Sequence, residues 1–221
     1  MPEHAPILPV IAAEVAALAP GFRALSLTVE AAPIVRPEIA DRAVERACQA
    51  LARGEPDWAE AHLAAWAEAF RRFGAKPQRT PCSAEALRKR ALRDGGLPSI
   101  DPVVDLYNAI SVQFAIPVGG ETFDTLKNGE AVDESPDPGE VVWRDDLGVT
   151  CRRWNWRQGV RTRLDASARR MWFILESLPE MPLAALHEAG GLLLDELRLM
   201  MPGMRADSRL LCVATEPTDS V

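Results

Sequence analysis

The stretch Leu97–Phe114, LPSIDPVVDLYNAISVQF, constrains the fold more than any other part of the chain. Asp101 directly precedes Pro102, an order typical of a helix N-cap followed by the first helical residue. Apolar residues then recur at the spacing of one face of an α-helix. They are Val103, Leu106, Tyr107, Ile110 and Phe114. The segment therefore predicts an amphipathic helix that begins after Asp101.

Asp105 and Asn108 lie three residues apart on a different face of this predicted helix. An amide with two donors and an acceptor, set near a carboxylate, can recognise a ligand. The structural alternative is that Asn108 only holds a neighbouring loop in place, because most buried polar groups are satisfied in this way. The spacing alone leaves both interpretations open.

The composition limits the class of protein. The chain has 221 residues, enough for one large domain or for a domain with a helical appendage. A hydrophobic share of 48% and a charged share of 26% are typical of a soluble globular protein. No run approaches the roughly 18 apolar residues of a membrane span. The start, MPEHAPILPV, has no basic region before its apolar residues, so it does not read as a signal peptide. We therefore expect a cytoplasmic protein with no membrane segment.

The four cysteines and three histidines are scattered along the chain. Their spacing matches neither a metal site nor a histidine-based catalytic triad. Reduced thiols are the plain interpretation of such cysteines. Gly119-Gly120 is not followed by a phosphate-binding pattern, so a nucleotide-cradling loop is not expected either. The sequence thus predicts no metal and no cofactor.

The formal net charge of −7 argues against indiscriminate binding to nucleic acid such as DNA. Positive charge nevertheless gathers in two clusters, which can contact a phosphate backbone locally. Alternatively, these side chains pair with the abundant carboxylates on a solvated surface. The first cluster comprises Arg88, Lys89, Arg90 and Arg93, and the second comprises Arg152, Arg153, Arg157, Arg161, Arg163, Arg169 and Arg170.

Periodicity, capping residues and glycine stops predict four further helices. They cover Glu38–Arg53, a segment from an Asp57 cap to Phe73, Ala84–Arg93 with Ser83 as its cap, and Pro182–Met200. One of them carries an aromatic stripe that is expected in the core. The stripe consists of Trp58, His62, Trp66 and Phe70.

Alternating or short apolar runs predict strands. These strands are Phe22–Glu30, Val141–Arg144, Val149–Gln158, Met171–Leu178 and a short last one, Leu210–Ala214. Between them we expect a turn at 115–120, an irregular loop at 121–140 and a turn with a helical start at 162–168. The tail TEPTDSV is expected to be disordered.

The predicted strand Val149–Gln158, VTCRRWNWRQ, is the second informative stretch. Strict alternation places Arg152, Trp154 and Trp156 on one face. The opposite face then presents Cys151, Arg153, Asn155 and Arg157. Two guanidinium groups around an amide suit recognition of a carboxylate or phosphate, since each donates two parallel hydrogen bonds. Cross-strand pairing with acidic residues is the alternative.

Four motifs together resemble a known family. They are SAEALRKRAL, LPSIDPVVDLYNAIS, PVGG and GEVVWRDDLGVTCRRWNWRQ. They resemble the tRNA-editing core of phenylalanyl-tRNA synthetase, formed by the third and fourth domains of its beta subunit, as a free-standing relative. The resemblance covers roughly Leu25 to Leu178.

The resemblance implies an α+β fold with a layered, sandwich-like mixed β-sheet and flanking helices, and the predicted C-terminal helix lies outside it. We expect an N-terminal lead at 1–20, the editing-like domain at 21–180, and a C-terminal helix and tail at 181–221. The implied activity is hydrolysis of the ester between a wrong amino acid and its tRNA.

The chain departs from the pattern of the synthetase at several pocket positions. Of a Thr-Asn pair that lines the editing pocket, Asn108 keeps its type and Tyr107 does not. Gly119 stands where the synthetase has the histidine of a Pro-x-His motif. The counterpart of a glutamate that meets the substrate's amino group falls near Arg157-Gln158, which is not acidic. An α-ammonium is repelled by guanidinium, so the preferred ligand is expected to be anionic at that point.

A further departure follows the PVGG motif. Free-standing relatives usually carry a strand and turn before a Gly-Glu-x-Phe motif, whereas here Gly120 runs directly into Glu121-Thr122-Phe123. The shorter connection is expected to expose a sheet edge or to open the pocket.

Three hypotheses follow: a hydrolase of misacylated tRNA acting in trans, a non-catalytic module that binds tRNA or an amino-acid-like metabolite, and an interaction protein with a well-packed Arg–Trp strand. In the first, Asp105 and Asn108 are the catalytic candidates. The substrate-binding candidates are Ser99, Asp101, Tyr107, Gly119, Arg153, Asn155 and Arg157. The RNA-binding candidates are Arg88, Lys89, Arg90, Arg152, Arg161 and Arg163.

Overall fold

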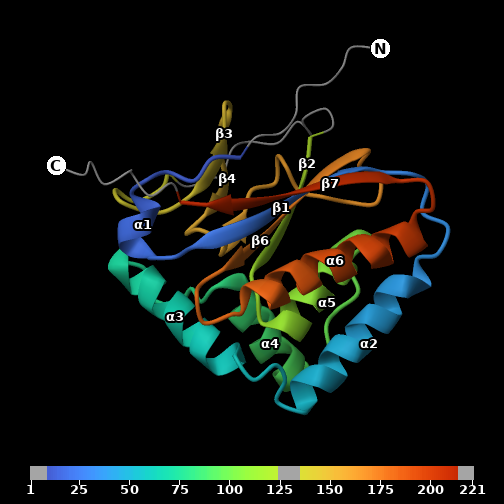
Figure 1. The fold of residues 1–221 in the computed structure, drawn as a ribbon, viewed down its shortest axis with the longest axis horizontal. Helices are drawn as coiled ribbons and strands as arrows, with labels where there is room; N and C mark the ends of the chain where they lie inside the picture. Colours follow the sequence, from blue (N-terminus) through green and yellow to red (C-terminus); the bar gives the residue numbers. More distant parts are fainter. Residues whose placement is uncertain (1–8, 124–134, 214–221) are drawn as a thin grey trace.

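The computed structural model describes residues 9–123 and 135–213, and its centre is a four-stranded sheet in the order β2-β6-β1-β7 (Figure 1). β1 (Arg23–Glu30) pairs along its whole length with β6 (Arg170–Ser177) on one side and with β7 (Arg205–Cys212) on the other. β2 (Val118–Thr122) pairs with the outer side of β6. All these pairs are antiparallel, so the first and last described strands of the chain lie side by side.

A smaller sheet packs beside the central one. It comprises β3 (Trp143–Asp145), β4 (Gly148–Arg152) and the two-residue β5 (Arg157–Gln158), in that order and antiparallel. Asp145 holds the β3–β4 turn, since its Oδ1 accepts hydrogen bonds from the backbone N–H groups of Leu147 (2.9 Å) and Gly148 (3.0 Å).

Three long helices cover one face of the central sheet (Figure 1). They are α2 (Glu38–Ala52), α5 (Pro102–Phe114) and α6 (Leu183–Met200). Leu25 and Leu27 of β1 and Phe173 of β6 bury their side chains against them. Gly190 permits α6 to approach closely, because a Cβ there would lie 2.2 Å from Leu25 Cδ2.

The opposite face of the sheet carries a second, aromatic core. It is covered by α1 (Val15–Leu18), α3 (Ala59–Arg72), the start of α4 (Ser83–Asp94) and the turn that follows β4. The Trp66 and Trp154 rings meet edge-to-face with centroids 5.1 Å apart, and Phe22 lies equally close to Trp154. Edge-to-face contacts between buried rings add stability beyond their area.

The α+β class, the layers and the C-terminal helix are as predicted. The Asp101 cap is confirmed, because its carboxylate accepts a hydrogen bond from Val103 N–H at 2.9 Å and α5 begins at Pro102. His62, Trp66 and Phe70 are fully buried, as the core prediction requires. β7 completes the sheet that begins with β1, and the division of the chain at residue 180 stays a prediction.

Two predicted helix caps are wrong. α3 begins at Ala59 after Trp58, and Asp57 makes no capping bond. Ser83 is the first residue of α4 rather than its cap, and its buried hydroxyl has no hydrogen-bond partner. The Asn155 side chain, distant in sequence, takes that role: its Oδ1 accepts the Ser83 N–H at 3.3 Å. A tertiary contact therefore replaces the local cap.

Four predicted segments between helices also differ from the structure. The turn expected at 115–120 ends early, and Gly119 and Gly120 lie inside β2. The strand expected over Val149–Gln158 is interrupted by a turn, where Arg153 (φ 46°) and Trp154 (φ 64°) are left-handed. Residues 162–168 contain no helical turn, and the last strand starts earlier, at Arg205.

The loop predicted at 121–140 is only partly confirmed. Glu121 and Thr122 belong to β2, residues 135–142 are irregular, and 124–134 lie outside the described residues, as does the tail from 214. The edge of β2 is partly covered: Thr122 N–H donates to Thr162 O at 2.9 Å, and the Gln158 amide donates to Gly120 O at 2.7 Å. These bonds protect a sheet edge that the short connection was expected to expose.

Candidate functional site

The carboxylates at the start of α5 are occupied by structural hydrogen bonds. Asp105 is buried and accepts bonds from the Ser99 hydroxyl (2.9 Å) and from Ile100 N–H (2.9 and 3.1 Å). Besides capping α5, Asp101 accepts the Ala166 N–H at 2.7 Å. Both groups therefore fasten loops to the helix, and this geometry favours a structural role for Asp101, Asp105 and Ser99.

Tyr107 and Gly119 lie on different faces of the central sheet. The Tyr107 ring packs on Phe173 and on Gly120, where a Cβ would lie only 2.9 Å from its Cε1. Burial, reinforced by the Asp101 charge, raises the pKa of Tyr107 to about 12. Gly119 instead faces Ile174. Asn108 is half-buried, and no hydrogen bond of its amide occurs in the described part of the chain.

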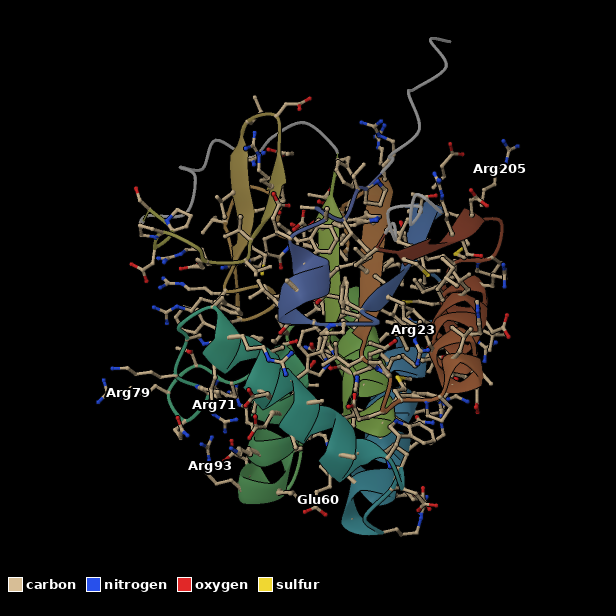
Figure 2. All side chains as sticks on the ribbon, turned by 60° about the vertical axis from the view of Figure 1, so that its left-hand side comes forward. Arg23, Glu60, Arg71, Arg79, Arg93 and Arg205 are labelled. Atoms are coloured by element: carbon tan, nitrogen blue, oxygen red, sulfur yellow. The ribbon has the colours of Figure 1, made fainter. Side chains whose placement is uncertain are left out.

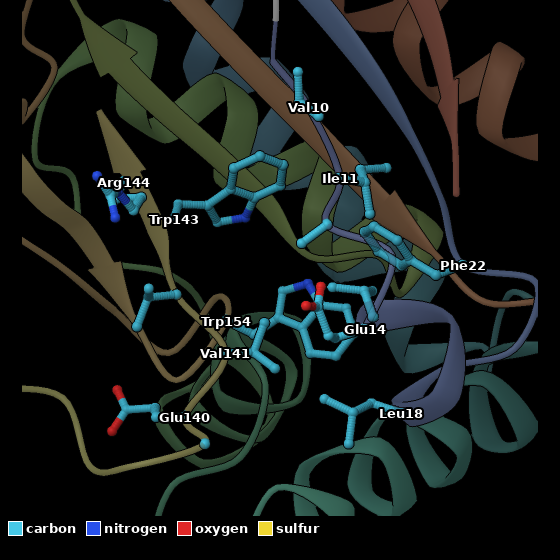
Figure 3. A pocket seen from close by; sticks show the side chains of 14 residues that line it. Val10, Ile11, Glu14, Leu18, Phe22, Glu140, Val141, Trp143, Arg144 and Trp154 are labelled. Carbon is cyan, nitrogen blue, oxygen red and sulfur yellow. The ribbon is translucent and has the colours of Figure 1, made fainter. Parts of the chain in front are cut away.

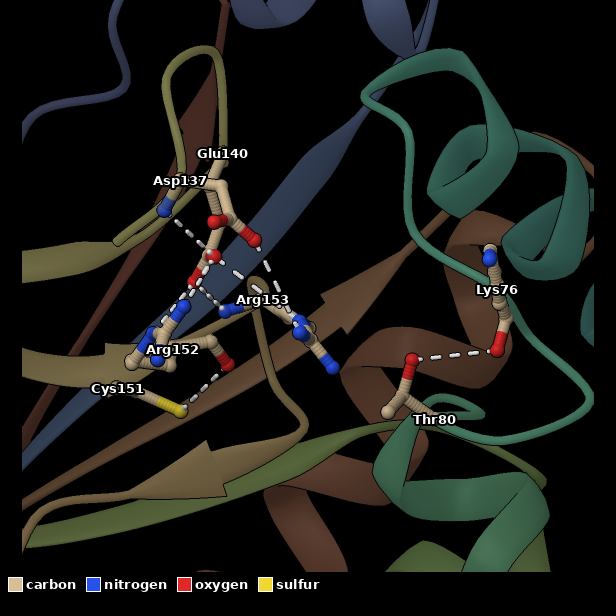
Figure 4. A network of polar contacts seen from close by, with 7 residues as sticks. All are labelled: Lys76, Thr80, Asp137, Glu140, Cys151, Arg152 and Arg153. Atoms are coloured by element: carbon tan, nitrogen blue, oxygen red, sulfur yellow. Dashed lines mark hydrogen bonds and ion pairs between the residues drawn. The ribbon is translucent and has the colours of Figure 1, made fainter. Parts of the chain in front are cut away.

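Arg153, Asn155 and Arg157 do not line one face of a continuous strand as predicted, and the neighbouring Arg152 is paired within the protein. Arg152 is buried and makes a bidentate pair with Glu140, at 2.9 Å from Nε and 2.6 Å from Nη2 (Figure 4). The neighbouring Arg153 N–H donates to the same carboxylate at 2.9 Å, and the Arg153 guanidinium lies 4.8 Å from the Trp156 ring centroid. The left-handed turn ends the alternation of side chains along the strand. The Arg152–Glu140 pair holds the loop before β3 against β4.

Asn155 belongs to a saturated buried cluster, which we call the Glu176 cluster (Glu176, Trp143, Asn155). Glu176 on β6 accepts hydrogen bonds from Trp143 Nε1 (2.8 Å) and Asn155 Nδ2 (2.9 Å). Asn155 in turn caps α4. Burial raises the pKa of Glu176 to about 7 against the opposing effect of these bonds. The cluster joins the central sheet, the small sheet and α4.

A second buried glutamate lies where β2 meets the small sheet. Glu121 is only 6% exposed. Its neighbours include Thr150 on β4 and Thr162 and Arg161 from the loop after β5. The loop is held against β2 by the backbone bond from Thr122 to Thr162 and by a bridge between Glu121 and Arg163. We call Glu121, Thr150, Arg161 and Thr162 the Glu121 site.

The Glu121 site differs from the Glu176 cluster in how completely its buried polar atoms are hydrogen-bonded. Burial raises the pKa of Glu121 to about 7, and the nearby Thr150 and Thr162 hydroxyls and the Arg161 charge oppose this rise only in part. Arg161 Nε and Thr162 Oγ1 are buried, and neither has a partner at full hydrogen-bond geometry within 9–123 and 135–213. Buried polar atoms without a hydrogen-bond partner are rare in proteins, and a catalytic role is one of the explanations for them. Near pH 7 this carboxyl is divided between its charged and neutral forms, as acid–base catalysis requires.

Asp145 positions the arginine of the Glu121 site. Its carboxylate holds both terminal nitrogens of Arg161, at 2.6 Å from Nη1 and 2.7 Å from Nη2. The guanidinium is thereby fixed, and only Nε remains unsatisfied. The pKa of the Asp145 carboxyl is correspondingly lowered despite partial burial.

The model of the B3/4 domain family matches residues 65–189, more than half of the chain. The chain belongs to the B3/4 domain family. This domain family is found in the editing region of the phenylalanyl-tRNA synthetase beta subunit. No curated protein and no solved structure gives a significant match. Asn108 and the whole Glu121 site lie inside the matched B3/4 segment.

Most predicted RNA-binding cations of this B3/4 protein are engaged in its own structure. Buried Arg88 donates to Val112 O (2.6 Å) and Glu55 O (3.0 Å). Lys89 pairs with Glu85 at 2.5 Å, and Arg90 lies 3.7 Å from Asp94. In Figure 2, Arg71, Arg79 and Arg93 extend from the same side of the molecule, near α3 and α4. Arg71 and Arg93 pair there with neighbouring carboxylates.

Arg157 and Arg163 differ from these cations. Both are exposed, and no ion pair joins either to a carboxylate within 9–123 and 135–213. Arg163 adjoins Glu121 through the backbone bridge, and Arg157 opens β5, the strand that ends at Gln158. Arg163 therefore adjoins the Glu121 site, and Arg157 lies at the start of the neighbouring strand β5 of the B3/4 domain.

Glu121 was not among the functional candidates predicted from the sequence. The available signal was the run Gly120-Glu121-Thr122-Phe123, in which an acidic residue follows two glycines in a predicted turn. Among the described residues of the B3/4 protein, no group of three or more histidine, cysteine or acidic side chains is arranged to bind a metal ion. No helix in that part is both long and apolar enough to cross a membrane.

Proposed function

We propose that this B3/4 protein is an aminoacyl-tRNA editing-type hydrolase that acts in trans on misacylated tRNA in the cytoplasm. The observation that carries the proposal is the Glu121 site. It combines a buried carboxyl whose pKa is about 7 with two unsatisfied polar atoms, inside the matched family segment. We assign the role of general base to Glu121 rather than to Asp105, the catalytic candidate from the sequence, because hydrogen bonds from Ser99 and Ile100 already occupy the Asp105 carboxylate.

Ester hydrolysis needs a base, a positioned water and a donor for the developing oxyanion. Ionised Glu121 removes a proton from a water, whose oxygen then attacks the ester carbonyl carbon. The bond from that carbon to the ribose oxygen breaks, and the proton held by Glu121 passes to the ribose oxygen. The free amino acid and tRNA leave, and the Glu121 carboxylate is restored.

The unsatisfied atoms have matching roles in this scheme. The Thr162 hydroxyl accepts a hydrogen bond from the attacking water, and Arg161 Nε–H donates to the oxyanion. Asp145 keeps the guanidinium in place without occupying Nε. Asn108, on α5, is a candidate through the family resemblance alone, since no contact joins it to Glu121 within the described residues. Arg157 and Arg163 contact phosphates, since their charges are not neutralised by carboxylates in the described part of the chain.

The test is deacylation of a panel of tRNAs, each charged correctly or wrongly, by the purified protein and by Glu121→Gln and Asn108→Ala variants. The matched control is Glu60→Gln, an exposed glutamate on α3. Release of one class of amino acid, lost in Glu121→Gln and kept in Glu60→Gln, supports the proposal. Release that is unchanged in Glu121→Gln contradicts the role of Glu121. No release from any substrate by folded protein contradicts the hydrolase.

A second candidate is a module that binds aminoacyl-tRNA without chemistry. It is favoured by the structural engagement of Asp101, Asp105 and Asn155 and by glycine at position 119, where the synthetase has histidine. Binding of tRNA without deacylation, at an affinity that falls steeply with salt, would identify this module.

A further inference from the structure

An apolar cavity lies between the N-terminal segment and the chain that leads into β3 (Figure 3). Its volume is about 530 Å³, within the range of small-molecule sites. The N-terminal segment forms one wall, and the chain entering β3 forms the other. The principal apolar lining residues are Ile11, Leu18, Phe22, Val141, Trp143 and Trp154.

The aromatic walls are rigidly held. Trp154 is almost fully buried between Phe22 and Trp66, with both centroids 5.1 Å from its own. The Trp143 indole is fixed through its hydrogen bond to Glu176 and its edge-to-face contact with Trp172 at 5.5 Å. A cavity with fixed aromatic walls is already organised for a flat or branched apolar group, so little ordering entropy opposes binding.

Charge at this cavity is asymmetric. Three charged residues line it: Glu14, Glu140 and Arg144. Glu140 is neutralised by Arg152, and in Figure 3 Glu140 and Arg144 point away from the aromatic walls. Glu14 lines the cavity from the N-terminal wall, and its side chain is exposed. Its carboxylate makes no hydrogen bond or ion pair within 9–123 and 135–213, so its charge is available to a ligand.

We propose that this cavity is a second binding site, for a small organic cation that joins an ammonium group to an aromatic or branched apolar body. The body fills the space between Trp143, Trp154 and Phe22, and the ammonium reaches the Glu14 carboxylate at the mouth. Aromatic faces add a cation–π attraction that neutral and anionic analogues lack. The N-terminal wall lies before residue 65, outside the B3/4 match. The inference therefore does not rest on the proposed hydrolase activity.

The experiment compares three probes with the same body: 2-phenylethylamine, 2-phenylethanol and 3-phenylpropionate. Binding to the full chain is measured by calorimetry and by tryptophan fluorescence, since two tryptophans line the cavity. We expect the amine to bind best. In Glu14→Gln its affinity should fall about fivefold, the value of a partly exposed ion pair, and its advantage over the alcohol should shrink. The matched control, Glu60→Gln, should bind like the parent protein.

A cavity-filling variant, Leu18→Trp, should lose binding of all three probes while keeping the circular dichroism of the parent. Val141→Phe replaces it should Leu18→Trp fail to fold. Equal binding of the three probes, unchanged amine affinity in Glu14→Gln, or no binding by any probe up to millimolar concentration each overturns the proposal. A deacylation rate that stays the same in Glu14→Gln separates this site from the Glu121 site.

Discussion

Two buried glutamates with raised pKa values occur in the part of the chain that the structure describes, and their surroundings differ. Glu176 has a hydrogen-bond donor on each carboxyl oxygen, from Trp143 and Asn155. Glu121 lies beside Arg161 Nε and Thr162 Oγ1, two buried atoms with no partner at full hydrogen-bond geometry in that part of the chain. Burial raises the pKa of both carboxyls to about 7. A perturbed pKa alone therefore does not distinguish a structural group from a functional one, and the saturation of the surrounding donors does.

The difference matters because an unsatisfied site can gain from a ligand and a saturated one cannot. Any water or substrate that reaches Thr162 and Arg161 restores hydrogen bonds that burial removed. In the Glu176 cluster a new ligand would have to displace bonds that link β6, β3 and α4. We therefore expect changes at Glu121 to affect activity and changes at Glu176 to affect stability.

The largest expected effect separates the two glutamates by activity. Glu121→Gln should lower the deacylation rate about a thousandfold, the middle of the range for a general base, whereas Glu176→Gln should retain it within about threefold. Single-turnover rates on the best substrate of the tRNA panel would measure this. Equal losses in both variants would show that the two sites act together rather than separately.

Stability should separate them in the opposite order. Glu176→Ala leaves the Trp143 and Asn155 donors buried without an acceptor, and should cost about 3 kcal/mol of unfolding free energy. Glu121→Ala should cost less, about 1 kcal/mol, because the groups beside it are hydroxyls rather than two buried N–H donors that depend on its carboxylate. Urea unfolding of both variants measures the difference. A larger loss in Glu121→Ala would make the Glu121 site a structural one.

Both glutamates should share one pH signature. Their folded pKa of about 7 exceeds the ordinary value of 4.5, so the folded state binds more protons between these limits. Each therefore contributes stability below pH 4.5 that is lost as the pH rises to about 7.

Against either Gln variant, the parent protein should lose on the order of 3 kcal/mol of unfolding free energy across that window and nothing further above it. His62, whose pKa is lowered to about 4 by burial, acts in the opposite sense in the parent and in both variants, and it cancels in the difference. If the difference in unfolding free energy between parent and variant did not change with pH, the pKa of that carboxyl would not be raised.

The smallest expected effect concerns the cations near the Glu121 site. Arg163→Ala and Arg157→Ala should each reduce the slope of log affinity for tRNA against log salt by about 1, as loss of one phosphate contact does. Lys89→Ala should leave the slope unchanged, because Lys89 is paired with Glu85 on the far helix α4. If only Lys89→Ala changed the slope of log affinity against log salt, the RNA-binding surface would lie on α4 and not beside the Glu121 site.

Much of the fold could be predicted from local patterns. Asp101 and Pro102 begin α5 as expected, the apolar stripe of α5 is buried, and α6 extends to Met200. The predictions failed where a distant group took over a local role. Asn155 caps α4 in place of Ser83. The Tyr107 ring occupies the space that a Cβ at position 120 would need, so a glycine lies inside β2. Alternation failed at Arg153 and Trp154, because a left-handed turn reverses which face each side chain occupies.

The sequence by itself determined the α+β class, the long helices and the membership of the B3/4 family, because periodicity, caps and motifs are short-range signals carried by neighbouring residues. Only the tertiary structure decided which charges are available. Asp105 is hydrogen-bonded and Arg152 is ion-paired with groups that folding brings to them. Glu121, Thr162 and Arg161 Nε lie together in a buried region. The physical reason is that the free energy of a charged or polar group depends on its burial and its partners. Both are set by contacts between segments that lie far apart in the chain.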